Sequence, residues 1–198
     1  MGKVIRHFKT VCKHKWYVLK ECAACGILWQ GITHDISKFS RAEFMPSARH
    51  FQGHRSPIEA EKELEGYSSA WLHHKGRNPH HWEYWIDFGA DGEIIANRIP
   101  YKYVLEMVCD WIGAGKAYSG EKWTQKTPYE YYRKVRKGRH FHAQTEKTLE
   151  LMLEWIADSG LETFHELART GNESIWYPDM DMPEEDRREW WLNREKAD

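Results

Sequence analysis

Apolar residues recur at the spacing of one helical turn along most of this sequence, and this period restricts the fold more than any other feature. In residues 3–26 it aligns one apolar stripe, formed by Val4, Phe8, Val11, Val18 and Cys22. Similar patterns and capping signatures predict further helices over 40–51, 58–75, 101–117, 127–138, 143–158 and 161–169. Residues 86–99, with apolar flanks around a Gly-Ala-Asp-Gly centre, favour a small hairpin or an ordered loop. We therefore predict an all-α helical bundle.

The chain length limits the number of domains. With 198 residues the chain is long enough for one domain with a sizeable core but short for two. We assign residues 1–170 to a single helical domain and residues 171–198 to a peripheral tail, acidic at first and then mixed in charge. Three tryptophans indicate that part of this tail docks on the domain: Trp176, Trp190 and Trp191.

Charge and hydropathy exclude several classes of protein. Lys and Arg number 29 and Asp and Glu number 30, so the formal net charge of -1 gives no general affinity for nucleic acid or anionic membranes. The mean hydropathy is -0.80, and no apolar run approaches the roughly 20 residues that span a bilayer. The first residues lack the uninterrupted apolar stretch of a secretory signal. We expect a cytoplasmic protein, and the sequence carries no signal for a particular oligomeric state.

Two of the four cysteines form a Cys-x-x-Cys pair, Cys22 and Cys25. No second pair accompanies it to complete a zinc site. On a helix the two thiols lie about one turn apart, on the same face as other apolar residues. We interpret them as reduced thiols that pack in the core.

The 12 histidines gather in pairs and short clusters, and these clusters are where the sequence indicates chemistry. The strongest signal is the adjacent pair His34 and Asp35. His14 precedes it, the segment HHKGRNPHH follows at 73–81, and Asp110 lies on a later predicted helix. Imidazole and carboxylate donors without nearby thiols suit a divalent transition metal, which would be Mn, Fe, Co, Ni or Zn. A mixed donor set with open positions indicates a catalytic site.

Helical spacing separates some of these histidines. His74 continues the inner stripe of the helix predicted over 58–75, whereas His73 falls on another face, so His74 is the better inward candidate. The Asn-Pro dipeptide that follows has the pattern of a helix start. The short helix that it opens carries His80 and His81.

The order His, His-Asp, Asp on successive predicted helices resembles the HD-domain superfamily of metal-dependent phosphohydrolases. The common motif of that superfamily is His-Asp-Ile-Gly-Lys, and residues 34–38 here are His-Asp-Ile-Ser-Lys. The histidines of HHKGRNPHH are similar to the additional ones in members that hold two metals, including the HD-GYP branch, although the GYP signature is absent. Residues 10–155 also resemble an uncharacterised bacterial and phage family with the motifs HK, HDxSKF, HHxxxNPHHWEYW and EMxxDW. That second resemblance brings no known activity.

The HD resemblance implies an HD-like helical domain and a set of metal ligands. The set for one ion is His14, His34, Asp35 and Asp110. The residues that complete this site or hold a second ion are His74 and either His80 or His81. The first ligand is alternatively His7, because the superfamily pattern is loose at that point.

The same resemblance implies catalytic roles. Lys38 matches the lysine that faces a substrate phosphate. Glu83, or a His80 that binds no metal, is the candidate general base. Arg77 and the basic residues of 133–139 either extend the anion site or form a solvated helix face.

The implied reaction is hydrolysis of a phosphoester, with a nucleotide or another small phosphorylated molecule as substrate and one or two divalent ions that activate water. The serine at position 37 and the missing GYP element argue against cyclic dinucleotides. Two other functions stay open. One is a di-iron oxygenase of the HD type, which the extra histidine pair allows. The other is a non-catalytic, metal-stabilised interaction module in which the tail tryptophans bind a partner.

Overall fold

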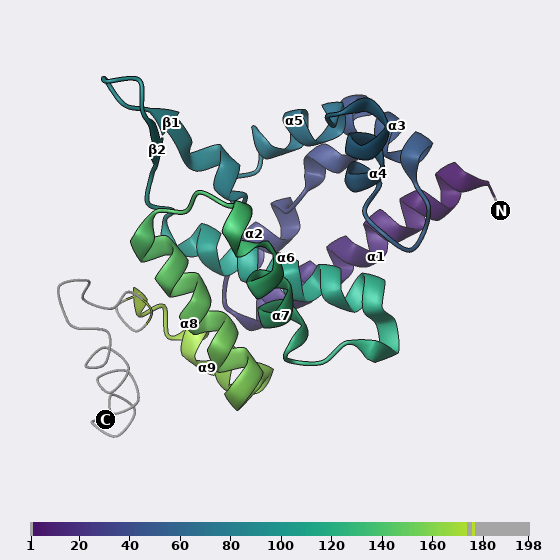
Figure 1. Ribbon diagram of the computed structural model, residues 1–198. Coiled ribbons are helices and arrows are strands. Elements are labelled where there is room, and N and C mark those ends of the chain that lie inside the picture. Colours follow the sequence, from purple (N-terminus) through teal and green to yellow (C-terminus); the bar gives the residue numbers. More distant parts are fainter. Residues whose placement is uncertain (1, 174–175, 177–198) are drawn as a thin grey trace, which may run out of the picture.

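The computed structural model describes residues 2–173 and 176. This part of the chain is mostly helical and carries one two-stranded hairpin, so the predicted fold class is confirmed (Figure 1). The elements in chain order are α1 (Lys3–Ala24), α2 (Leu28–Thr33), η1 (Ile36–Phe39), α3 (Arg41–His50), α4 (Pro57–Glu65), α5 (Ser69–Lys75), η2 (Trp82–Trp85), β1 (Ile86–Phe88), β2 (Ile94–Ala96), α6 (Tyr101–Ser119), η3 (Gly120–Lys122), α7 (Thr127–Val135), η4 (Arg136–Gly138), α8 (Ala143–Ser159) and α9 (Leu161–Arg169). None of the described helices combines the length and the apolar character needed to cross a membrane.

The two longest described helices, α1 and α6, pack directly against each other at the centre of the fold. Their contact is close because Gly113 of α6 has no side chain. A Cβ atom at this position would lie 2.5 Å from Val18 Cγ2 and 3.0 Å from the backbone nitrogen of Val18. This close approach brings the polar residues that α1 and α6 place on the shared interface within contact distance of one another.

The buried face of α1 differs from the predicted stripe at its N-terminal end. Val4 and Phe8 were expected to face inward, but they are 50% and 47% exposed. His7 and His14 lie on the buried face instead, at 5% and 6% exposure. The rest of the stripe is buried as predicted. The interior side of this helix therefore carries imidazole rings where a purely structural helix would carry apolar side chains.

The helix predicted over 58–75 is in fact two helices, α4 and α5. Gly66 has a φ of 80° and ends α4 in the left-handed conformation that glycine adopts most readily. Ser68 then begins α5, because its side chain accepts a hydrogen bond from a backbone amide in the first turn. The spacing argument still holds within α5, where His74 is buried and His73 is partly exposed.

The hairpin lies within 86–99, where the sequence favours one. Its strands β1 and β2 are antiparallel and pair Ile86 with Ala96 and Phe88 with Ile94. In Figure 1 the hairpin extends away from the helices. No other strand occurs in the part of the chain that the structure describes.

One residue of the predicted tail is part of the hydrophobic core. Trp176 is fully buried, and its ring packs on those of Trp155 and Phe164. Docking of the tail is thus observed at this tryptophan. Trp190 and Trp191 lie outside the described residues.

The thiols pack in the core as predicted. Cys22, Cys25 and Cys109 are buried and free, and the Sγ atoms of Cys25 and Cys109 are 3.8 Å apart. Burial raises the pKa of the Cys109 thiol well above its ordinary value. The Cys109 thiol is therefore protonated, and all three side chains pack as small apolar groups.

Candidate metal centre

Seven side chains from five segments converge at one point of the interior: His14 from α1, His34 and Asp35 after α2, His74 from α5, His80 and His81 before η2, and Asp110 from α6. The backbone at Asp35 is unusual, with a φ of 53°, and Asp35 is the sole non-glycine residue with positive φ among those described. Asp and Asn tolerate this left-handed conformation better than most residues. Such strain is typical of functional positions.

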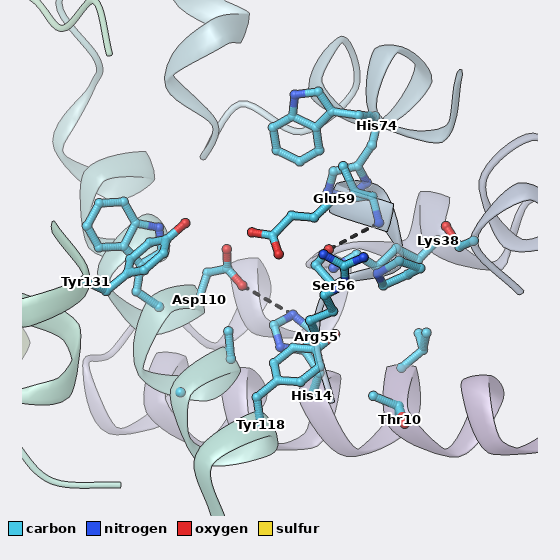
Figure 2. A pocket seen from close by; sticks show the side chains of 18 of the residues that line it. Thr10, His14, Lys38, Arg55, Ser56, Glu59, His74, Asp110, Tyr118 and Tyr131 are labelled. Atoms are coloured by element: carbon cyan, nitrogen blue, oxygen red, sulfur yellow. Dashed lines mark hydrogen bonds and ion pairs between the residues drawn. The ribbon is translucent and has the colours of Figure 1, made fainter. Parts of the chain in front are cut away.

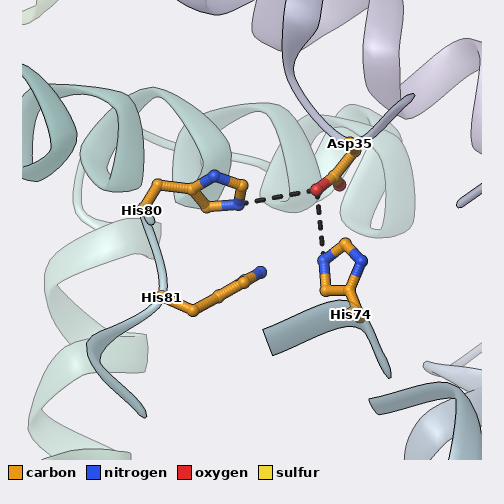
Figure 3. A group of neighbouring side chains, drawn as sticks. All are labelled: Asp35, His74, His80 and His81. Carbon is orange, nitrogen blue, oxygen red and sulfur yellow. Dashed lines mark ion pairs between the residues drawn. The ribbon is translucent and has the colours of Figure 1, made fainter. Parts of the chain in front are cut away.

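The structure contains three groups of possible donors among the described residues; one is His34, His80 and Glu106, and the other two share Asp35. The first group is His14, His34, Asp35 and Asp110, and the second group is Asp35, His74, His80 and His81. Within each group the donor atoms lie within 4.8 Å of one another. The two oxygens of Asp35 face different groups, since Oδ2 lies 3.1 Å from His34 Nε2 and Oδ1 lies 3.1 Å from His74 Nε2. Figure 3 shows the second group around Asp35, which bridges the two groups.

The imidazole rings are oriented as metal ligands would be. The following atoms are buried and have no hydrogen-bond partner in the described part of the chain: Nε2 of His14, His34, His74, His80 and His81, and Oδ1 of Asp35. A buried polar atom without a partner costs about 1–3 kcal/mol. A cation in each group would contact the atoms of that group and remove that cost, and imidazole and carboxylate donors suit Mn, Fe, Co, Ni and Zn. The protein thus positions buried His and Asp groups to hold a metal ion.

Two buried glutamates hold the opposite side of these rings. Glu106 Oε1 accepts a hydrogen bond from His34 Nδ1 at 2.9 Å and lies 2.9 Å from His80 Nδ1. Glu43 Oε2 accepts a hydrogen bond from His74 Nδ1 at 2.7 Å. Such carboxylates fix the tautomer and orientation of a ligating imidazole. Glu106 therefore supports one ring of each group, whereas Glu43 supports the second group alone.

Sequence analysis missed both glutamates. Ser40 and Glu43 have the spacing of a capping box, but Ser40 makes no capping hydrogen bond with its side chain. The Glu43 carboxylate turns to the histidine pair of α5 instead, and its Oε1 lies 2.6 Å from His73 Nδ1. Glu106 precedes Asp110 by four residues on α6, so both point to the same side. That spacing from a candidate ligand was the available signal.

Burial and opposite charges act against each other in this centre. Burial raises the pKa of Asp35 and Asp110, but the neighbouring histidines, with Lys38 at Asp35, hold both pKa values well below the ordinary range. Burial likewise lowers the pKa of His34, and attraction by Asp35 outweighs it and raises this pKa well above the ordinary value. Burial and the adjacent histidines hold the pKa of His81 well below the ordinary value. The carboxylates are thus ionised and His81 is neutral, as metal ligands need to be, whereas His34 carries a proton that metal binding would displace.

The centre opens into a cavity of about 440 Å³ (Figure 2). Both groups contribute to its lining, through His14, His74, His81 and Asp110. Tryptophan rings form part of its wall. Pockets of this size accommodate small molecules, so a ligand in the cavity can reach the donors.

The candidate catalytic residues differ in their placement. Lys38 lines the cavity, and its Nζ lies 2.5 Å from Asp35 Oδ2. Glu83 also lines the cavity, and its Oε2 is buried without a hydrogen-bond partner among the described residues. Burial raises the pKa of Glu83. His80 lies among the second-group donors with its other nitrogen beside Glu106, so both of its ring nitrogens have a place in the centre.

The structure separates the alternatives that the sequence left open. The two groups include His14, His74, His80 and His81, but neither His7 nor His73. The His7 ring lies 5.0 Å from the Phe44 ring and lines the cavity. Burial and the charge of Lys38 lower the pKa of His7 to about 4, so its imidazole is neutral. We therefore assign the first-group imidazoles to His14 and His34.

The Asn-Pro dipeptide does not begin the predicted short helix. Residues 79–81 form a turn before η2, and Asn78 has another role. Its side-chain amide donates to Ser37 Oγ at 2.9 Å and to the His74 carbonyl at 2.7 Å. Ser37, which stands where the HD motif has glycine, thus ties the segment that carries Asp35 to the second group.

The basic residues of 133–139 lie in different environments. Arg136 pairs with Glu150 of α8, at 3.1 Å, and is part of the outer surface. Arg77 does not belong to the cavity lining, whereas Arg139 does. Of the residues expected to extend an anion site, Arg139 is the one that the fold brings to the cavity.

This fold and this donor set define a class of protein: a helical domain with a buried His and Asp centre that is positioned to hold a metal ion. Residues 3–155 match DUF5662, a family of unknown function, and the chain belongs to that family. No curated protein and no solved structure gives a significant match. The function therefore has to be argued from the centre itself.

Proposed function

We propose that this protein is a metal-dependent hydrolase of phosphoesters, and that its substrate is a nucleotide or another small phosphorylated molecule. The observation that carries the proposal is the pair of donor groups bridged by Asp35 beside a cavity that also presents Lys38. Two ligand groups that share one carboxylate suit a reaction in which the attacking and leaving oxygens of a phosphoryl group are stabilised together. The resemblance to the HD superfamily supports the same reaction.

A divalent ion held by these donors supplies Lewis acidity to a phosphoryl oxygen and lowers the pKa of a bound water. The residues of the chain orient the reactants around it. Asp35 sets the separation of the two groups because each of its oxygens faces one of them. The Lys38 ammonium, on the cavity wall, attracts the phosphate oxygens and offsets the charge that develops on them.

Glu83 provides a site for proton transfer. Its Oε2 has no partner in the described part of the chain, and the side chain lines the same cavity as Lys38. In the proposed reaction this oxygen takes a proton from the attacking water and passes it to the leaving oxygen. Trp82 and Trp111, also in the cavity wall, restrict the entry of other water molecules.

The test begins with the metal content of the purified protein beside Asp35→Asn. Asparagine tolerates the left-handed backbone of this position and removes only the charge. We expect the native protein to retain about one or two ions per chain and the variant to lose most of them. Asp158→Asn, on the exposed surface of α8, is the matched control and should retain the native content. Circular dichroism verifies that all three proteins are folded.

Activity is then measured on the loaded protein. Phosphate release from nucleotides and nitrophenyl phosphates with Mn, Co or Ni, absent in Asp35→Asn, supports the proposal. Consumption of dioxygen with iron and no release of phosphate would identify an oxygenase instead. Bound metal without either reaction would favour an interaction module. Failure of the native protein to take up any added metal would overturn the centre itself.

A further inference from the structure

Arg139 is held at the cavity wall in an unusual way. Its guanidinium carbon lies 4.9 Å from the centre of the Trp111 ring and 5.6 Å from that of Tyr131. Its Nη2 donates a hydrogen bond to the Tyr131 hydroxyl at 3.1 Å. Two aromatic rings and one hydroxyl thus fix the guanidinium. No carboxylate among the described residues forms an ion pair with it, although its charge acts on Glu83 and opposes the rise of the Glu83 pKa. The other N–H groups of Arg139 are left for a ligand.

The other cations of the cavity each have a carboxylate partner among the described residues. Arg55 makes two hydrogen bonds to Glu63, at 2.7 and 2.5 Å, and Lys38 pairs with Asp35 at 2.5 Å. Arginine binds carboxylates and phosphates through its planar set of donors. An arginine that is fixed in a cavity and lacks an acidic partner is therefore equipped to bind an anion from solution.

Arg139 and Lys38 lie in different parts of the wall of the same cavity. Trp111, on which Arg139 stacks, follows the donor Asp110 directly on α6. In Figure 2, Tyr131 lies on the Asp110 side of the cavity and Lys38 lies on the other side. A volume of about 440 Å³ leaves room for more than one phosphate group beside the metal donors.

Glu59 restricts what lies between Arg139 and the metal donors. Its side chain extends into the cavity in Figure 2, and no ion pair of the described part involves it. A carboxylate at this position repels a continuous row of phosphates and accepts hydrogen bonds from hydroxyl or amino groups. The middle of the ligand is therefore neutral or cationic.

We propose that Arg139 binds a second oxyanion of the substrate, so that the substrate is a phosphorylated molecule with a carboxylate or a second phosphate at its far end. This inference rests on the proposed function for the end that lies at the metal donors. Arg139 contributes specificity in this scheme, and the reaction itself takes place at the donor groups.

The test is titration calorimetry of the manganese-loaded protein with matched pairs of phosphonates. Each pair has a phosphonate at one end and either a carboxylate or a methyl group at the other: 3-phosphonopropionate with propylphosphonate, 5-phosphonopentanoate with pentylphosphonate, and 7-phosphonoheptanoate with heptylphosphonate. For at least one length we expect the carboxylate to improve affinity about tenfold or more, as one charge-assisted hydrogen bond does. Arg139→Gln should abolish this preference and Arg139→Lys should retain part of it. Arg133→Gln, on the exposed side of α7, should keep it in full.

The outcomes separate the two proposals. If the native protein binds both members of every pair equally well, the proposed role of Arg139 is wrong. Binding of the phosphonate group at the metal donors is then still supported. A preference that survives in Arg139→Gln overturns it as well, because another residue then binds the carboxylate. If no phosphonate binds, the metal donors do not bind a phosphate group. That result contradicts both the proposed function and the proposal of a ligand with two ends.

Discussion

The two donor groups that Asp35 joins are built differently. The first group takes His14 and Asp110 from α1 and α6, the longest described helices, which are in close contact at Gly113. The second group takes its imidazoles from the seven-residue helix α5 and from a turn. The first group has two carboxylates, and the second has three imidazoles beside the shared carboxylate. One group is thus more anionic and set on long helices, and the other is richer in nitrogen and set on short elements.

This contrast means that the two positions should differ in affinity and in metal preference. Carboxylate oxygens favour Mn and imidazole nitrogens favour Co, Ni and Zn. The first group offsets more of the charge of a divalent ion, because the Asp110 carboxylate belongs to it alone. We expect two ions that bind in sequence, the first group being filled before the second.

The largest effect is expected from substituting a donor that belongs to one group alone. Asp110→Asn should weaken binding of the ion in the first group by about two orders of magnitude or more and leave the ion in the second group bound. His81→Gln should weaken binding in the second group and leave binding in the first group unchanged. Metal content after dialysis against a graded chelator measures both. Asp158→Asn serves as the control for the charge change. If either variant loses both ions together, the two groups form one cooperative site and the contrast between them is wrong.

The next effect is expected at the supporting glutamates. Glu106→Gln should lower the affinity for both ions by about ten- to a hundredfold, since this carboxylate contacts one ring of each group. Glu43→Gln should weaken the second ion alone, because its described ring partners are the histidines of α5. The comparison uses competition with a fluorescent chelator. A selective loss in Glu106→Gln would show that only one of its two histidine contacts matters.

A smaller effect, on the stability of the fold, is expected from an ion pair between helices α1 and α6, which carry donors of the first group. Glu21 of α1 accepts hydrogen bonds from Lys116 of α6 at 2.6 Å and from His165 of α9 at 3.1 Å. Burial raises the pKa of Glu21, but the hydrogen bonds from His165 and Lys116 outweigh it, and the pKa falls below the ordinary 4.5. The stabilisation is therefore complete above about pH 4.5 and is lost as the pH falls through the lower pKa of the folded state.

Glu21→Gln should accordingly lower the free energy of unfolding by about 1.5–3 kcal/mol at neutral pH. The difference from the native protein should shrink as the pH falls below about 4.5 and through the lower pKa of Glu21 in the folded state. Urea unfolding of the metal-free proteins across this range measures the difference without a contribution from metal release. A difference that does not change with pH would mean that the charge of Glu21 does not stabilise the fold.

The smallest effect is expected at the contact between the segment of Asp35 and the second group. Ser37→Gly removes the oxygen that accepts from the Asn78 amide, but that amide still donates to the His74 carbonyl. We expect the second ion to bind about two- to fivefold more weakly and the first to be unaffected. Chelator competition resolves a change of this size. Ser159→Gly, at the last turn of α8, tests whether any Ser-to-Gly change has the same effect.

The period of the sequence was enough to predict most of the helices and the inward position of His74, because both depend on local spacing. It did not predict the turn that divides 58–75 into α4 and α5. On α1, His7 and His14 are buried, whereas Val4 and Phe8, which the stripe placed inward, are half exposed. Burial on this helix follows what α6 and α3 present to it, and a hydropathy pattern treats an imidazole as polar wherever it lies.

The candidate site was predicted in part for a similar reason. The donors stand out as residue types in the sequence, and the structure brings them together in two groups. Glu43 was not recognised as a site residue because Ser40 and Glu43 match the spacing of a helix cap. In the structure Glu43 instead contacts histidines 30 and 31 residues away in the sequence. Arg139 was one of several basic residues in 133–139, and only the course of the chain after η4 distinguishes it.

The contact between Gly113 and Val18 has a consequence for ion size. His14 Nε2 and Asp110 Oδ1 lie 3.2 Å apart, and each donor is within one helical turn of the point where a Cβ atom would meet Val18. The distance between these donors is therefore set by the spacing of two helix axes. A larger residue at 113 would separate the helices and shift the centre toward ions of larger radius. The choice of ion in the first group thus depends on a glycine that contacts none of the ligands' donor atoms.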